Sequence, residues 1–172
     1  MRIFVRRHAR ILAALTALGV GLGVFVAVWF QPQRLLTDDT VHDPLPVATA
    51  PGPDGAPPAA PVVLASAMLG DRAHHASGDV RVLRLADGSR VVRLEGLDVE
   101  NGPDLYVTLA AAAPDAPDAA YDSEYVSLGR LKGNKGDQTY AVPAGVDLSR
   151  YASLVIWCKR FSTAFGTAPL RG

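Results

Sequence analysis

The sequence predicts a mainly β domain, an antiparallel β-sandwich, preceded by one N-terminal transmembrane helix and a linker rich in proline and alanine. Three observations predict this arrangement. Residues 11–30 carry no charge, residues 31–61 contain eight of the 13 prolines, and residues 62–172 alternate short β-rich runs with turn residues. We therefore expect a basic cytoplasmic N-terminus at 1–10, a membrane span at 11–30, a disordered stalk at 31–61 and a folded domain at 62–172.

The apolar run ILAALTALGVGLGVFVAVWF is long enough to cross a bilayer, because about 20 helical residues span its ~30 Å hydrocarbon core. Four arginines precede this run, and the next arginine or lysine after it is Arg34. Since positive residues favour the cytoplasmic side, we expect an uncleaved, single-pass signal anchor in the cell membrane with an extracytoplasmic C-terminal domain. A cleaved signal peptide is the alternative, but VWFQPQ follows the run where an A-x-A-like cleavage site is needed.

The segment from Gln31 to Pro61 has the composition of a linker, with proline, alanine, glycine, threonine and aspartate. Such a composition buries too little apolar surface to fold by itself. Proline-rich chains favour an extended conformation of about 3.1 Å per residue. We therefore expect a semi-rigid stalk that holds the domain several tens of ångströms above the membrane.

The last segment shows short strands separated by turns. Asp87-Gly88 lies between two β-rich runs and predicts a hairpin, and residues 105–110 alternate with a period of two. Further strands are expected at 125–131, 138–142 and 154–158, the last as a central strand because it is apolar on both faces. The arginines of the first hairpin suggest an edge position. Short strands and repeated turns favour a sandwich or barrel.

Composition and motifs exclude several classes of protein. With 17 Lys+Arg against 17 Asp+Glu, the chain lacks the basic excess of a nucleic-acid binder. A single cysteine excludes an internal disulfide and a CxxC pair. Neither a G-x-S-x-G motif nor a distinctive pair of carboxylates is present, so no catalytic constellation is recognisable. Gly133 and Gly136 resemble a phosphate cradle, but no helical pattern follows them, and we expect a hairpin turn there.

Three segments of the last part resemble a known family. They are AHHASGDV at 73–80, NGPDLYVTL at 101–109, and the run from Leu128 to Leu170 with its LKG, QTY, VPAGVDL, VIWC and FG pieces. In this order and spacing they resemble the DM-thirteen domain, a DOMON-related β-sandwich module of extracytoplasmic proteins. The resemblance implies a DOMON-like fold and a role in electron transfer through a family cysteine, which is Cys158 here. It assigns no cofactor, metal or substrate; a redox partner protein or a small ligand is the expected partner.

Cys158 is the candidate redox thiol, and two interpretations are open. Alternation along the strand places it on the face of Leu154 and Ile156, which favours a buried packing role. The neighbouring Lys159 and Arg160 favour the other interpretation, because nearby cations promote the reactive thiolate.

His74 and Asp104 are weak candidates for ligand binding. His74 and His75 are adjacent, so in an extended chain only one imidazole can face a given site. His74 is either a ligand to a metal or haem, or a hydrogen-bonded structural residue. Asp104 either binds turn amides or lines a pocket with His74 at one end of the sandwich. A ligand-binding or adhesion module without catalysis is therefore the alternative function. Residues 121–125 are expected to be a solvated rim.

Overall fold

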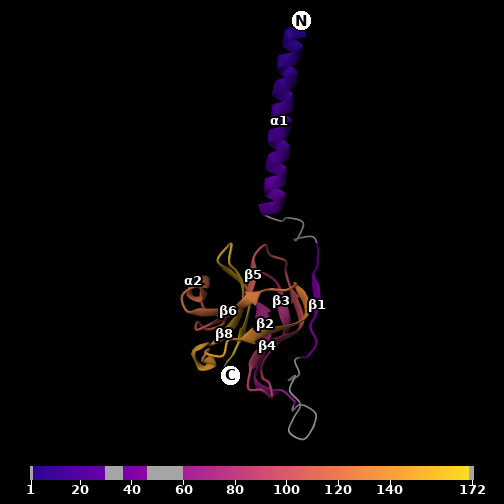
Figure 1. The fold of residues 1–172 in the computed structure, drawn as a ribbon. Coiled ribbons are helices and arrows are strands. Elements are labelled where there is room, and N and C mark those ends of the chain that lie inside the picture. The colour runs from indigo at the N-terminus through magenta and orange to yellow at the C-terminus, as the bar shows by residue number, and fades with distance from the viewer. Residues whose placement is uncertain (1, 30–36, 46–59, 171–172) are drawn as a thin grey trace. The chain divides into compact units, whose positions relative to one another are not determined.

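The computed structural model of the protein describes residues 2–29, 37–45 and 60–170. It divides the chain into an N-terminal unit that ends at Thr37 and a β-rich unit that begins at Asp38 (Figure 1).

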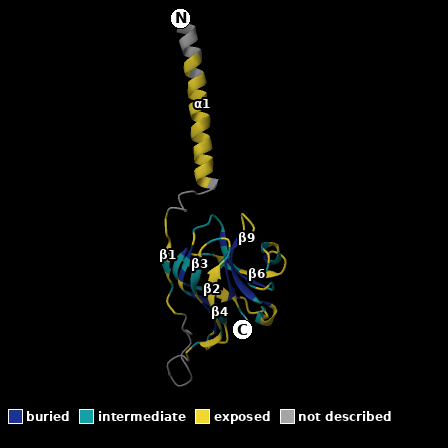
Figure 2. Ribbon diagram, turned by 180° about the vertical axis from the view of Figure 1, so that it is seen from behind, coloured by how far each residue is buried: buried dark blue, intermediate teal, exposed yellow. Residues whose placement is uncertain are grey.

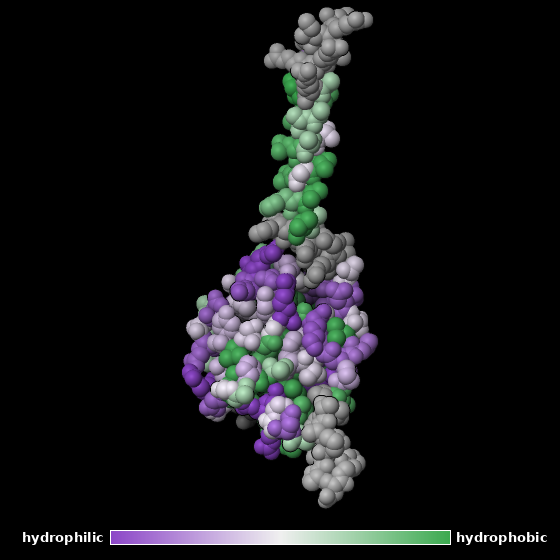
Figure 3. All heavy atoms as spheres, viewed as in Figure 1, coloured by the Kyte–Doolittle hydropathy of each residue, from purple (hydrophilic) through white to green (hydrophobic). Residues whose placement is uncertain are grey.

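The N-terminal unit contains one helix, α1 (Arg2–Trp29). Within it, the 18 residues Ile11–Val28 have a mean hydropathy of 2.5, and all of their side chains are exposed (Figures 2 and 3). Apolar surface of this size is unfavourable in water and favourable in hydrocarbon. The expected apolar helix is thus confirmed and is consistent with membrane anchoring, while its orientation stays a prediction.

The described part of the second unit contains nine strands in one hydrogen-bonded series, ordered β1-β7-β4-β3-β2-β9-β8-β5-β6. Neighbouring strands are antiparallel, except for the parallel pair of β1 and β7. The strands are β1 (Thr40–His42), β2 (Val62–Asp71), β3 (Ala76–Arg84), β4 (Arg90–Val99), β5 (Leu105–Ala110), β6 (Tyr125–Arg130), β7 (Lys135–Val142), β8 (Ser153–Cys158) and β9 (Thr163–Pro169). Two short helices, α2 (Asp118–Tyr121) and η3 (Leu148–Arg150), connect strands.

Strand β2 joins the two halves of this sheet. It pairs with β3 along Val62–Leu69 and with β9 only at Gly70 and Asp71. Side chains from both halves form one apolar core, which includes Val80, Val92, Leu109 and Ile156. The sheet therefore curls around a shared interior. The expectation of a mainly β domain is confirmed, and its described strands form one continuous curled sheet; the DOMON-like sandwich stays a prediction.

Strand β8 lies between β9 and β5, and all six of its residues are buried. Leu154, Ile156 and Cys158 belong to the inner core, whereas Val155 and Trp157 belong to a second cluster on the opposite face. The predicted central strand and the alternation of its side chains are confirmed, because a strand buried on both faces needs apolar residues at every position.

Two expected positions in the sheet are wrong. The hairpin of β3 and β4 is not at an edge, since β2 pairs with β3 and β7 pairs with β4. The edge strands of the described sheet are β1 and β6. The glycine loop at 133–136 is not a hairpin turn either. Strand β6 pairs with β5 and β7 pairs with β4, so this loop connects the two halves of the sheet.

The expectation of an unstructured stalk is wrong for part of its length. Residues 38–45 run along β7 and contain β1, although residues 31–36 and 46–59 of the expected stalk lie outside the described residues. Backbone pairing and ion pairs hold this acidic segment on the domain. The expectation of disorder was based on low hydrophobicity, which takes no account of these two interactions.

Candidate functional site

Cys158 is a free cysteine with an exposed fraction of zero. It lies at the end of β8, in register with Leu105 of β5 and Thr163 of β9, and packs in the inner core with Leu105 and Phe165. A cysteine in apolar surroundings behaves as a small hydrophobic residue and is inert toward exchange.

His74 lies near this end of the sheet, in the loop between β2 and β3. Its ring stacks on Phe165, with 3.9 Å between ring centroids, and its Nδ1 lies 3.2 Å from Oε2 of Glu100. The side chain is 36% exposed. Phe165 belongs to the same core cluster as Cys158, so His74 covers an aromatic ring of that core from outside.

His75 has a different partner. Its Nδ1 lies 3.2 Å from Oδ1 of Asp71, and the same oxygen accepts a hydrogen bond from the backbone N–H of Ala76 at 2.7 Å. The two adjacent imidazoles therefore contact separate carboxylates, as the geometry of an extended chain predicts.

Asp104 forms an ion pair with Arg130, at 3.1 Å between Oδ1 and Nη2. Arg130 and Lys159 both lie near the ring of Tyr106, at 5.7 and 5.9 Å from its centroid. Among the described residues, no hydrogen bond or ion pair joins His74, Asp104 and Cys158 to one another. A pocket shared by His74 and Asp104 stays a prediction.

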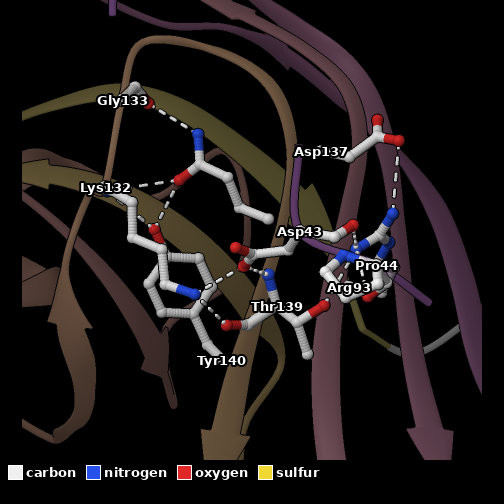
Figure 4. A network of polar contacts seen from close by, with 9 residues as sticks. Asp43, Pro44, Arg93, Lys132, Gly133, Asp137, Thr139 and Tyr140 are labelled. Atoms are coloured by element: carbon white, nitrogen blue, oxygen red, sulfur yellow. Dashed lines mark hydrogen bonds and ion pairs between the residues drawn. The ribbon is translucent and has the colours of Figure 1, made fainter. Parts of the chain in front are cut away.

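The most extensive polar network lies elsewhere, along the edge of β7 (Figure 4). Asp43 is its centre: its carboxylate is bonded by Lys132 Nζ and accepts the backbone N–H of Thr139 at 2.8 Å. The hydrogen bond from Lys132 lowers the pKa of Asp43. An ionised acid with two donors is well stabilised at neutral pH.

Tyr140 extends this network into the core. Its hydroxyl donates to Oε1 of Gln138 at 2.6 Å and accepts the backbone N–H of Lys132 at 3.0 Å. Burial raises the pKa of Tyr140 to about 12. Gln138 is fully buried and donates to the carbonyl of Gly133, so the loop before β7 is tied to the core.

Arg93 of β4 is a buried cation, with 3% of its side chain exposed. Its Nη1 donates to the carbonyls of Asp43 and Pro44 and to Oγ1 of Thr139, and its Nη2 pairs with Asp137. The segment of β1 thus supplies two of the acceptors that Arg93 requires, since a buried charge without partners is unfavourable.

A metal site is not evident at either place. Within the described ranges, no three side chains of His, Cys, Asp or Glu are grouped so that they could hold an ion.

Comparison with known protein families shows the family to which the chain belongs. The family model described as electron transfer DM13 matches residues 68–170, which is more than half of the chain. The chain belongs to the electron transfer DM13 family. No curated relative and no solved structure matches it.

The DM13 match contains His74, Asp104 and Cys158, but it begins after β1. The residues on β1 and the buried Arg93 were missed by the sequence reasoning. One signal was present: Asp38, Asp39 and Asp43 form an acidic cluster, and the LKGNKG piece of the DM13 domain supplies Lys132 and Lys135.

Tyr121 also differs from its expectation. It is 2% exposed, packs edge-on against Trp157 at 6.2 Å, and donates its hydroxyl to the carbonyl of Pro114. The turn of α2 places it against the outer face of the DM13 sheet, so the solvated rim begins only at Asp122.

Proposed function

We propose that this chain is a membrane-tethered electron-transfer module, with its DM13 domain on the extracytoplasmic side. The match of residues 68–170 to the electron transfer family carries the proposal, on a chain that also has an apolar helix. The arginines before that helix support a cytoplasmic N-terminus.

In this proposal Cys158 is the redox thiol, and its burial restricts how it reacts. In thiol–disulfide exchange the Cys158 thiolate would attack a disulfide of the partner protein, form a mixed disulfide with one partner sulfur and release the other as a thiolate, so the partner disulfide is the oxidant and the attacking sulfur must be exposed. Cys158 has no exposed surface, so its reaction with a partner requires local opening of the core around it, to which His74 and Gly102 are adjacent through Phe165. A β-carbon at Gly102 would lie 2.9 Å from Leu105 and Phe165, which shows how closely this loop covers the core.

Voltammetry of the full chain in detergent, with a small-molecule disulfide and its thiol present as exchange partners, tests the proposal, together with an absorption spectrum and metal analysis. We expect reversible electron exchange in the parent protein and its loss in Cys158→Ala and Cys158→Val, with only a small loss of thermal stability in the valine variant. A parent protein that exchanges no electrons contradicts electron transfer. Variants that keep the exchange show that another group carries it.

An apolar cleft favours a second candidate, the binding of a small apolar ligand. Strand β2 pairs with β9 only at Gly70 and Asp71, near its C-terminal end. A cleft of about 360 Å³ lies between the first half of β2, where this pairing is absent, and the end of β9. This volume lies within the usual range for small-molecule sites. The cleft is lined by Leu64, Ala65, Val82, Leu148, Ser149 and Leu170.

Fluorescence of 1-anilinonaphthalene-8-sulfonate tests this candidate. We expect the parent protein to enhance the emission, Ala65→Leu to abolish the enhancement by filling the cleft, and Ala86→Leu in an exposed turn to leave it unchanged. Equal emission from all three proteins would contradict a specific apolar site.

A further inference from the structure

The segment Asp38–Leu45, called here the β1 segment, precedes the family match and docks on the edge of β7. Its backbone pairs in parallel, with Thr40 opposite Lys135 and Val41 opposite Gly136. Hydrogen bonds flank the pairing at both ends: Lys135 N donates to Asp39 O, and Asp43 N donates to Asp137 O at 2.9 Å. The backbone of the β1 segment therefore behaves as a strand of the domain.

Acidic side chains of the β1 segment meet donors and cations on the domain. Asn134, itself 5% exposed, donates from Nδ2 to Oδ1 of Asp38 and accepts the N–H of Asp39 at 2.7 Å. Lys135 lies 3.6 Å from Asp38, and Lys132 binds Asp43. Opposite charges on the domain therefore stabilise the docked segment at both of its ends.

Two glycines of the domain make room for the β1 segment. A β-carbon at Gly133 would lie 2.2 Å from the carbonyl oxygen of Asp39, and one at Gly136 would lie 2.2 Å from that of Val41. Neither separation is sterically possible, so any side chain at these two positions would displace the segment. Backbone pairing, buried polar partners and a side-chain-free surface together form a docking site for an extended acidic chain.

This docking changes the length of the tether between membrane and domain. Helix α1 ends at Trp29 and the β1 segment begins at Asp38, so only the eight residues 30–37 separate them. A fully extended chain covers at most about 3.6 Å per residue, which limits the tether to roughly 30 Å. A stalk made of all of residues 31–61 would reach about 95 Å in the polyproline conformation.

We propose that docking of the β1 segment on β7 makes the DM13 domain membrane-proximal, with residues 30–37 as its whole tether and residues 46–61 as an internal connection between β1 and β2. The inference rests on the proposed membrane anchoring by α1. A redox partner would then have to reach a domain whose β1 segment begins within roughly 30 Å of the membrane surface.

Insertions into the full chain test the inference in vesicles. A donor dye is attached at Ala86→Cys in the exposed turn after β3, and acceptor dyes are carried by lipid head groups. The same 20-residue Gly/Ser insert, whose own root-mean-square length is about 25 Å, is placed either after Gln33 or after Asp54. We expect the insert after Gln33 to lower energy transfer severalfold and the insert after Asp54 to leave it at the parental value.

Release of the β1 segment provides the control. Val41→Pro with Asp43→Ala removes a backbone donor and the central carboxylate while leaving residues 68–170 unchanged. In this background we expect both inserts to lower the transfer. Equal loss from both inserts in the parental background, or no loss from either, would overturn the inference. A chain that fails to remain with vesicles after flotation would instead contradict membrane anchoring itself.

Discussion

Gly136 and Val41 approach so closely that a β-carbon on the glycine would lie 2.2 Å from the valine carbonyl oxygen. Gly136 also has φ of +89°, a conformation that residues with a side chain rarely adopt. Both constraints act at the same residue, and the close approach is a consequence of pairing β7 with a segment that lies 95 residues away in the sequence.

We predict that Gly136→Ala detaches the β1 segment and lowers the free energy of unfolding by about 1–3 kcal/mol, since the new methyl group meets both a clash and backbone strain. Hydrogen exchange should show loss of protection at Thr40–His42. Gly145→Ala is the matched control, because nothing lies within 4 Å of its β-carbon position. Full protection of β1 in Gly136→Ala would contradict the prediction.

Asp43 makes the docking dependent on pH. The hydrogen bond from Lys132 lowers its pKa below the ordinary value of 3.8. Its stabilisation is therefore present above pH 3.8 and is lost as the pH falls through the lower, folded-state value. We expect Asp43→Asn to cost about 1 kcal/mol at pH 7 and much less near pH 2. Urea unfolding at both pH values measures this, with the exposed Asp115→Asn as control; a cost that does not depend on pH would contradict it.

Arg93 needs a guanidinium, because its two terminal nitrogens serve acceptors on β1 and β7 at the same time. We predict that Arg93→Lys lowers the free energy of unfolding by about 2 kcal/mol, since an ammonium group does not reproduce this geometry. Glu95 lies near both arginines, 3.6 Å from Nε of Arg93 and 3.2 Å from Nη1 of Arg81. The side chain of Arg81 is 43% exposed, so Arg81→Lys should cost less than about 0.5 kcal/mol. Equal losses of unfolding free energy in Arg93→Lys and Arg81→Lys, measured by thermal unfolding, would show that the burial of Arg93 by the β1 segment does not contribute to stability.

Cys158 should behave as a buried thiol in the resting protein. We expect a thiol reagent to modify it slowly in the native protein, at the rate of local opening, and rapidly after addition of urea, because its exposed fraction is zero. Cys158→Ser should lower the free energy of unfolding by about 1–3 kcal/mol by placing a hydroxyl among apolar side chains, and Cys158→Val should cost less. Rapid modification of the native protein would contradict this placement.

Local patterns in the sequence were sufficient for elements whose character depends on neighbouring residues. The uncharged run at 11–30 predicted the apolar part of α1, and the two-sided apolar run at 154–158 predicted a central strand. The Asp87-Gly88 turn predicted the hairpin of β3 and β4, where Gly88 has φ of +83°. Strand β2 was harder to predict, because its Ala, Ser and Gly residues give no clear alternation.

Part of the candidate site could be predicted as well. Alternation predicted the inward position of Cys158, but the partners of His74 and Asp104 lie after β4 and at the end of β6 and could not be derived from spacing. Their contacts with Glu100 and Arg130 depend on how the strand ends meet in three dimensions.

The amino-acid sequence by itself determined the apolar helix, the mainly β character and the family of the domain, because periodicity and turn chemistry act over a few residues. Only the tertiary structure decided that an acidic stretch of the linker becomes a strand, that Arg93 is buried, and that the glycines of the LKGNKG piece receive another backbone. These features depend on groups that approach each other across some 50 to 95 residues, where steric fit and charge pairing outweigh local propensity.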